Sequence, residues 1–204
     1  MHILVVNGSP KGKDSITLQT VNYLQVRYPG HTFEVLHAGQ RIKALEKDFA
    51  PALAAIEKAD LLLFSYPVYT FIAPSQRHRF IELLKAANPD LSGKYATQLT
   101  TSKHFYDVTA HRYIRDNCQD LGLRYIHGLS ADMDDLLQEK GQKEACAFFD
   151  YVCHCVRMEH YEPSRRRCPH LPTSRWKSPN PRPRGAAMWS LSPTLPTTIP
   201  SWPP

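Results

Sequence analysis

Three hydroxyl side chains, those of Ser9, Ser15 and Thr17, are spaced through one short segment near the start of the chain. They follow an apolar, β-branched run at 3–6 and lead into a stretch with helical spacing. Such a strand, loop and helix start would bring backbone amides and the positive end of a helix dipole to one point, where phosphate binds. The segment therefore indicates a phosphate site. An ordinary turn, in which Asp14 or Ser15 only caps the helix, is the open alternative.

The spacing of the glycines restricts which class of phosphate ligand this segment could bind. Gly8 and Gly12 are one residue too close for a Walker A loop, and Asp14 stands where that loop needs a hydroxyl for Mg²⁺. A carboxylate there would repel a triphosphate. The dinucleotide fingerprint is absent as well, because Gly8 is followed by Ser9 and Pro10 rather than by a second glycine. A monophosphate held by hydroxyls and backbone amides remains.

Two later loops carry further binding chemistry. The segment 66–74 contains three aromatic residues and two prolines, which stiffen the backbone. Tyr69 or Phe71 would suit the face of a flat ring, although these aromatics would also suit the packed end of a sheet. The next loop offers three hydroxyls, those of Thr100, Thr101 and Ser102. A phosphate loop, a stiff aromatic loop and a hydroxyl loop together favour flavin mononucleotide (FMN) over other common ligands.

The elements that must position these loops alternate between strands and helices. Strands are expected at 3–6, 32–37, 60–65, 94–101 and 123–126, and helices at 15–27, 41–59 with a bend at Pro51, 75–87, 108–121 and 134–157. This order predicts an α/β fold, with a doubly wound five-stranded parallel sheet covered by helices on both faces. Ligands of such sheets bind beyond the carboxyl ends of the strands, where the three loops are expected to meet.

The formal net charge of +6 comes from the end of the chain. Residues 163–204 contain seven basic residues and no acidic one, which leaves 18 basic against 19 acidic residues before them. The nearly neutral charge of the folded part argues against nucleic-acid binding by it. No apolar run approaches the length of a membrane span and no signal peptide is evident, so we expect a cytoplasmic protein that does not contact membranes. Five cysteines, an odd number gathered late in the chain, do not suggest a disulfide framework.

The composition also changes abruptly near residue 160. Eleven prolines stand from Pro163 onward, with basic residues and scattered tryptophans. We therefore expect a folded domain at 1–160 and a disordered, basic, proline-rich tail at 161–204. The tail is either an arm that binds nucleic acid or an SH3-like partner, or the frameshifted remnant of a longer protein.

Two stretches, ILVVNGSPKGKDSIT and ADLLLFSYPVYTFIAPSQRHRFIELL, resemble the flavodoxin-like NAD(P)H-dependent oxidoreductases. This family includes FMN reductases and iron–sulfur flavoproteins, and the resemblance covers about residues 1–157. It implies a flavodoxin-like fold and a homo-oligomeric oxidoreductase. Such an enzyme passes hydride or electrons from NADH or NADPH through bound FMN to an acceptor, which the sequence does not identify.

The resemblance also assigns residues to the cofactor. It places the phosphate against Ser9, Lys11, Ser15, Ile16 and Thr17, the flavin ring against Pro67, Val68, Tyr69, Thr70 and Phe71, and its other edge against Thr101 and Ser102. No catalytic side chain is expected, because the flavin carries the chemistry. His104 and His111 are expected to be surface histidines.

One departure from the family concerns metal. Iron–sulfur members carry a compact cysteine motif between the second and third strands, whereas residues 38–59 contain no cysteine. The group formed by Cys153, His154, Cys155, Cys168 and His170 lacks the spacing of a structural zinc site, so no metal is expected. The alternative function is a flavodoxin-like electron carrier or FMN-binding module without nicotinamide activity. Because such carriers are often strongly acidic, the nearly neutral core favours the enzyme.

Overall fold

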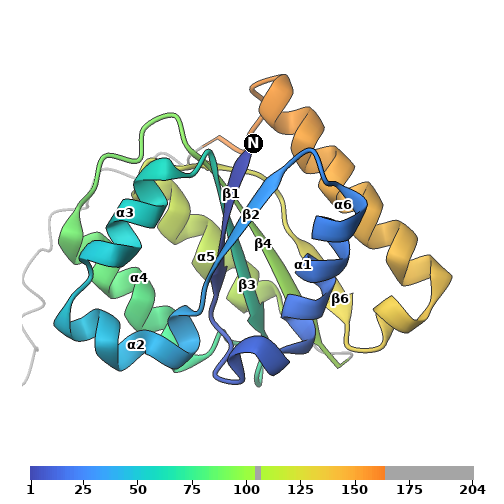
Figure 1. The fold of residues 1–204 in the computed structure, drawn as a ribbon, viewed down its shortest axis with the longest axis horizontal. Coiled ribbons are helices and arrows are strands. Elements are labelled where there is room, and N and C mark those ends of the chain that lie inside the picture. The colour runs from blue at the N-terminus through green and yellow to red at the C-terminus, as the bar shows by residue number, and fades with distance from the viewer. Residues whose placement is uncertain (104–106, 164–204) are drawn as a thin grey trace, which may run out of the picture. The chain divides into compact units, whose positions relative to one another are not determined.

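All strands of the sheet run parallel. In the computed structural model, which describes residues 1–103 and 107–163, the strands are β1 (His2–Asn7), β2 (Thr32–Leu36), β3 (Leu61–Pro67), β4 (Tyr95–Ser102), β5 (Arg124–Tyr125) and β6 (Leu129–Asp132). Their order is β2-β1-β3-β4-β5, and β6 also pairs with β4 (Figure 1). The predicted doubly wound, flavodoxin-like α/β fold is thereby confirmed, with a sixth strand added.

Helices cover both faces of the sheet. They are α1 (Ile16–Arg27), α2 (Ala38–Lys47), α3 (Ala50–Lys58), α4 (Ser75–Ala87), α5 (Val108–Asp120) and α6 (Glu139–Arg157), with short 3₁₀ turns at Gly12–Asp14 and Asp135–Leu137. Helices α1 and α6 pack on one face, and α2 to α5 pack on the other (Figure 1). The central strands are apolar at successive positions because both of their faces are covered.

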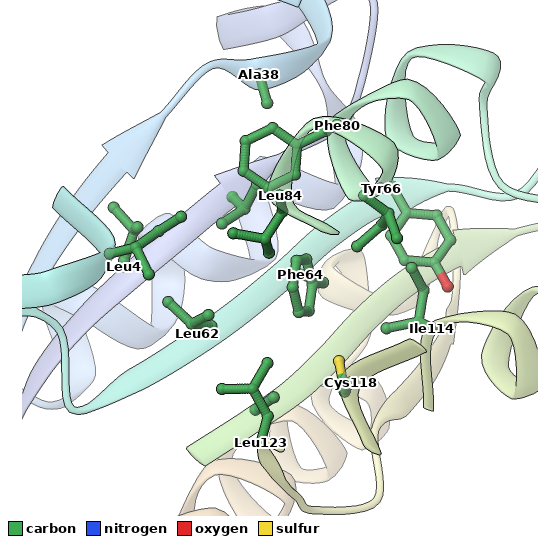
Figure 2. Close-up of a cluster of buried hydrophobic side chains, with 14 of the residues drawn as sticks. Leu4, Ala38, Leu62, Phe64, Tyr66, Phe80, Leu84, Ile114, Cys118 and Leu123 are labelled. Atoms are coloured by element: carbon green, nitrogen blue, oxygen red, sulfur yellow. The ribbon is translucent and has the colours of Figure 1, made fainter. Parts of the chain in front are cut away.

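The sheet therefore separates two hydrophobic cores. Beneath α2 to α5, the side chains of Leu62, Phe64 and Tyr66 from β3 pack against Phe80 and Ile114 (Figure 2). The opposite core, beneath α1 and α6, gathers the alternate side chains of the same strands around residues such as Phe149. Strand β3 contributes to both cores, as its continuous apolar run requires.

The region 41–59 forms two helices rather than the single bent helix that was predicted. Helix α2 ends at Lys47, where Asp48 takes up an extended backbone conformation. The Asp48 carboxylate accepts the backbone N–H of Ala50 at 3.0 Å, and Pro51 stands in the first turn of α3. Because proline has no N–H to donate, it suits a helix start. Pro51 therefore marks the beginning of a new helix.

The predicted fifth strand at 123–126 is also wrong in extent. Strand β5 covers only two of these residues, and β6, at Leu129–Asp132, is a further strand outside the predicted range that pairs with another part of β4. Between them, a Cβ atom on Gly128 would lie 2.4 Å from the carbonyl oxygen of Gln98, so this position needs glycine for the backbones to approach. The last helix begins at Glu139 rather than near 134, because a 3₁₀ turn precedes it.

The chain turns back on the sheet after α6. The backbone N–H of Glu162 donates to the carbonyl of Tyr125 at 2.8 Å. The predicted domain boundary at 160 stays a prediction, and the expected tail, disordered or frameshifted, lies outside the described residues from 164 on. No helix within residues 1–103 and 107–163 is long and apolar enough to span a membrane.

Candidate functional site

A cavity of about 480 Å³ opens at the carboxyl ends of β1, β3 and β4. It is lined by Ser9, Lys11, Ser15, Ile16, Thr17, Pro67, Val68, Tyr69, Thr70, Phe71, Thr101, Ser102, Lys103 and Met133. All twelve residues predicted from the sequence thus lie around one cavity, although the ligand contacts assigned to them stay predictions. Lys103 and Met133 were missed. Lys103 extends a predicted loop, and Met133 follows β6, the strand that the sequence pattern did not resolve.

The segment Gly8–Thr17, the phosphate loop from here on, is shaped by a buried asparagine at its entrance. The side-chain amide of Asn7 donates to the Gly12 carbonyl at 2.9 Å, and its oxygen accepts the Ser9 N–H at 3.0 Å. Gly12 has a φ of 56°, in the left-handed region that favours glycine. Asn7 therefore fixes the shape of the loop from inside, a role that sequence reasoning did not assign to it.

The hydroxyls of the phosphate loop are buried but border the cavity. Ser15 stands at the N-cap of α1, yet its side chain makes no capping hydrogen bond. The alternative reading, in which Ser15 only caps the helix, is therefore not supported by the geometry. Thr17, in the first turn, shares a 2.6 Å hydrogen bond with the Thr101 hydroxyl on β4. Helix α1 and β4 thus meet through two hydroxyls at the foot of the cavity.

The loop after β3 makes a tight turn that leaves its aromatic side chains at the cavity mouth. Tyr69 and Ile72 exchange backbone hydrogen bonds of 3.0 and 3.2 Å. Between them, Thr70 and Phe71 adopt φ values of 47° and 72°, which non-glycine residues seldom adopt. Tyr69 and Phe71 are 46% and 43% exposed, so the alternative reading of these two aromatics as core is wrong. Tyr66 is the aromatic that fills the core instead.

The end of β4 divides its hydroxyls between the two faces of the sheet. Thr101 faces the cavity, whereas the Thr100 hydroxyl lies 2.8 Å from Nε2 of His111 on α5. The expectation of a surface role for His111 is wrong, because this imidazole is largely buried and close to Asp107. Burial lowers the pKa of His111, and the Asp107 carboxylate opposes that shift. His104 lies outside the described residues.

Comparison with known proteins decides the family of the chain. The family model of NADPH-dependent FMN reductases matches residues 1–128. The chain belongs to the NADPH-dependent FMN reductase family. It is thus a flavin-dependent oxidoreductase, with FMN as its cofactor and NAD(P)H as its electron donor. No curated protein matches this FMN reductase family member.

Solved structures resemble this family member in fold. An NADH:FMN oxidoreductase in its apo form is 19% identical, with a TM-score of 0.62 over 79% of this chain and 91% of the other. An FMN-dependent NADH-azoreductase from Bacillus anthracis, in complex with FMN, is 15% identical, with a TM-score of 0.56 over 77% and 98%. An NAD(P)H:quinone oxidoreductase from Methanothermobacter marburgensis is 12% identical, with a TM-score of 0.57 over 81% and 99%. At these identities the likeness shows the fold alone.

The residues of this family member fit the phosphate end of FMN. Ser9, Ser15 and Thr17 are almost completely buried, so their hydroxyls are held in place beside the start of α1. Neutral donors at a helix N-terminus suit a monophosphate dianion. Within residues 1–103 and 107–163, no three His, Cys, Asp or Glu side chains are grouped as metal ligands. Cys168 and His170 lie outside those residues.

Proposed function

We propose that the cavity holds one FMN and that the enzyme passes reducing equivalents from NAD(P)H to a second, small acceptor at the same open face. The observation that carries this proposal is the meeting, around one cavity, of buried hydroxyls at a helix start and two half-exposed aromatic rings. The first group suits a phosphate and the second suits a flat ring, and FMN has one of each at its two ends.

At the phosphate end of the cavity, the enzyme's own residues bind and orient the phosphate group. Ser9, Ser15 and Thr17 donate hydroxyl hydrogen bonds, and the first turn of α1 adds backbone amides. Lys11, exposed at the rim, contributes positive charge without blocking entry. The Asn7 side chain keeps the loop in the required shape before the ligand arrives, so little ordering is needed on binding.

At the ring end, the loop Pro67–Phe71 lies against the cofactor and excludes water from one side. The N–H of Val68 donates to the Thr101 carbonyl at 2.9 Å, which ties this loop to β4. Thr101 and Ser102 border the opposite edge. When bound, FMN supplies the chemistry, accepting a hydride from a nicotinamide and releasing electrons to an acceptor. No side chain needs to act as acid or base.

The apolar rim of the cavity supports assembly into a homo-oligomer. The lining residues Ile16, Tyr69, Phe71 and Met133, and Ile72 next to Phe71, are each between 39% and 50% exposed. A group of exposed large apolar side chains is typical of a binding surface, for a ligand or for a second protein chain. We propose that a second copy covers part of this rim and leaves an entrance for the substrates.

The purified full-length chain tests this function directly. We expect a yellow protein, or a colourless one that becomes yellow with added FMN, whose absorption bleaches under NADH or NADPH without oxygen. Addition of a quinone should then restore the colour. A purified chain that does not bind added FMN would contradict the proposal. A yellow protein that neither nucleotide bleaches would favour the electron carrier.

Thr17→Val should weaken FMN binding by about tenfold, because it removes one hydrogen bond to a charged phosphate. The matched control is Thr20→Val, which removes a buried hydroxyl one turn along α1 and outside the cavity. Titration by quenching of flavin fluorescence measures both affinities. Equal affinity in the two variants would mean that Thr17 does not contact the phosphate.

A further inference from the structure

Arg77, in the first turn of α4, is a fully buried side chain that lies beneath the phosphate loop. Its Nη2 group donates hydrogen bonds to the carbonyls of Val6 on β1 and Ser65 on β3, the latter at 3.1 Å. The Ser65 carbonyl also accepts the N–H of Gly8 at 2.8 Å. The guanidinium and the first residue of the phosphate loop therefore share one acceptor.

Contact between Arg77 and the loop is direct. A Cβ atom placed on Gly8 would lie 2.7 Å from both Nε and Nη2 of Arg77. Any side chain at position 8 would thus collide with the guanidinium. Because Gly8 has no side chain, the positive charge of Arg77 can lie against the first residue of the phosphate loop, next to Ser9, which lines the cavity.

The charge of Arg77 has no carboxylate partner in the described part of the chain. Nε and Nη1 are buried without a hydrogen-bond acceptor, and no carboxylate pairs with the guanidinium there. Around it stand the rings of Phe64, Tyr66 and Phe80, with centroids 5.0, 5.4 and 5.9 Å from the central guanidinium carbon. Burial lowers the pKa of Arg77 to about 10, so the group is still positive at neutral pH.

An uncompensated buried charge is costly, and a nearby opposite charge reduces that cost. Resting on the proposed FMN site, we infer that Arg77 makes the site selective for phosphorylated flavin, FMN over riboflavin, without touching the ligand. A phosphate dianion in the loop acts on the guanidinium across the loop backbone, and the complete burial of Arg77 reduces the screening of that interaction by water. The uncharged ribityl end of riboflavin offers no such attraction.

Arg77→Met tests this role, because it replaces the charged side chain with an apolar one of similar length. Arg79→Met is the matched control: it removes the same charge from α4 at an exposed position, where Arg79 pairs with Glu46 and Glu82. The dissociation constants of FMN and riboflavin are measured for each full-length apoprotein at one ionic strength.

We expect Arg77→Met to bind FMN about tenfold more weakly and riboflavin with little change, so that the preference for FMN falls about tenfold. Arg79→Met should keep the wild-type preference. If Arg77→Met weakens both flavins equally, Arg77 only supports the loop, and the inference is overturned. Arg77→Gln provides a second neutral variant should the methionine variant fail to fold.

Inorganic phosphate offers a readout that needs no flavin. At constant ionic strength, replacing chloride with phosphate should raise the melting temperature of the wild-type and Arg79→Met apoproteins more than that of Arg77→Met. An equal shift in all three would overturn the inference. A wild-type chain that binds neither flavin would contradict the proposed function, while the phosphate measurement would still decide the role of Arg77.

Discussion

Gly39→Ala is expected to raise the dissociation constant of FMN by about a hundredfold, through strain of about 3 kcal/mol in the phosphate loop. Gly39 lies in the first turn of α2, against the backbone of that loop. A Cβ atom there would stand 2.3 Å from the Ser9 carbonyl oxygen and 2.7 Å from the carbonyl carbon of Gly8. Backbone atoms cannot rotate away as a flexible side chain can, so the loop itself must move.

Gly30→Ala is the matched control, because no atom lies within 4 Å of a Cβ placed at that position. Flavin titration of both variants, together with the rise in melting temperature that FMN gives each, separates lost binding from lost folding. If Gly39→Ala binds FMN with nearly wild-type affinity, α2 moves instead of the loop. The shape of the phosphate loop would then not depend on this contact.

Phe149→Ala should lower the free energy of unfolding by about 3–5 kcal/mol. Phe149 is 1% exposed on α6, and its ring centroid lies 4.6 Å from that of Tyr28 and 5.6 Å from that of Phe33. Loss of the ring would leave a cavity between α6, α1 and the edge strand β2. Unfolding by denaturant measures this change, provided that the free energy of unfolding falls with denaturant concentration at the same slope in both proteins.

Tyr151→Ala serves as the comparison, since this aromatic residue of the same helix is 45% exposed. Its substitution should cost well under half as much as that of Phe149. Similar losses in the two variants would mean that α6 is loosely packed. The result bears on the extent of the domain, because the family model ends at residue 128, before α6 begins. We propose that the folded unit extends to about residue 160.

Sequence reasoning succeeded where local pattern and tertiary environment agree. The buried runs of β1 and β3 are apolar at successive positions, so their strands and the parallel arrangement could be predicted. It failed where one residue changes the path of the chain. The apolar spacing alone does not distinguish a proline that bends a helix, as expected at Pro51, from one that begins a helix, and the signal of Asp48 before Pro51 was not used. The division of β5 from β6 likewise depends on close packing of Gly128 against β4.

The residues that line the candidate site could be predicted from the sequence, whereas the residues that support them could not. Its lining comes from loops that follow predicted strands, so topology alone brings Ser9, Tyr69 and Thr101 together. The supporting residues were missed because their roles arise from tertiary contacts. Asparagine is common in turns, so Asn7 did not stand out from its neighbours. Arginine is ordinarily exposed, so a buried Arg77 was not expected.

The turn at Thr70–Phe71 has a consequence for how such an enzyme diversifies. Its unusual backbone is closed by the two hydrogen bonds between Tyr69 and Ile72, and these side chains add little to either core. Residues there can be exchanged at small cost to the sheet, whereas changes around Asn7 or Gly39 disturb the cofactor cradle itself. Natural variation and directed evolution should therefore alter the ring end of the proposed site, at 69–72, more readily than the phosphate loop.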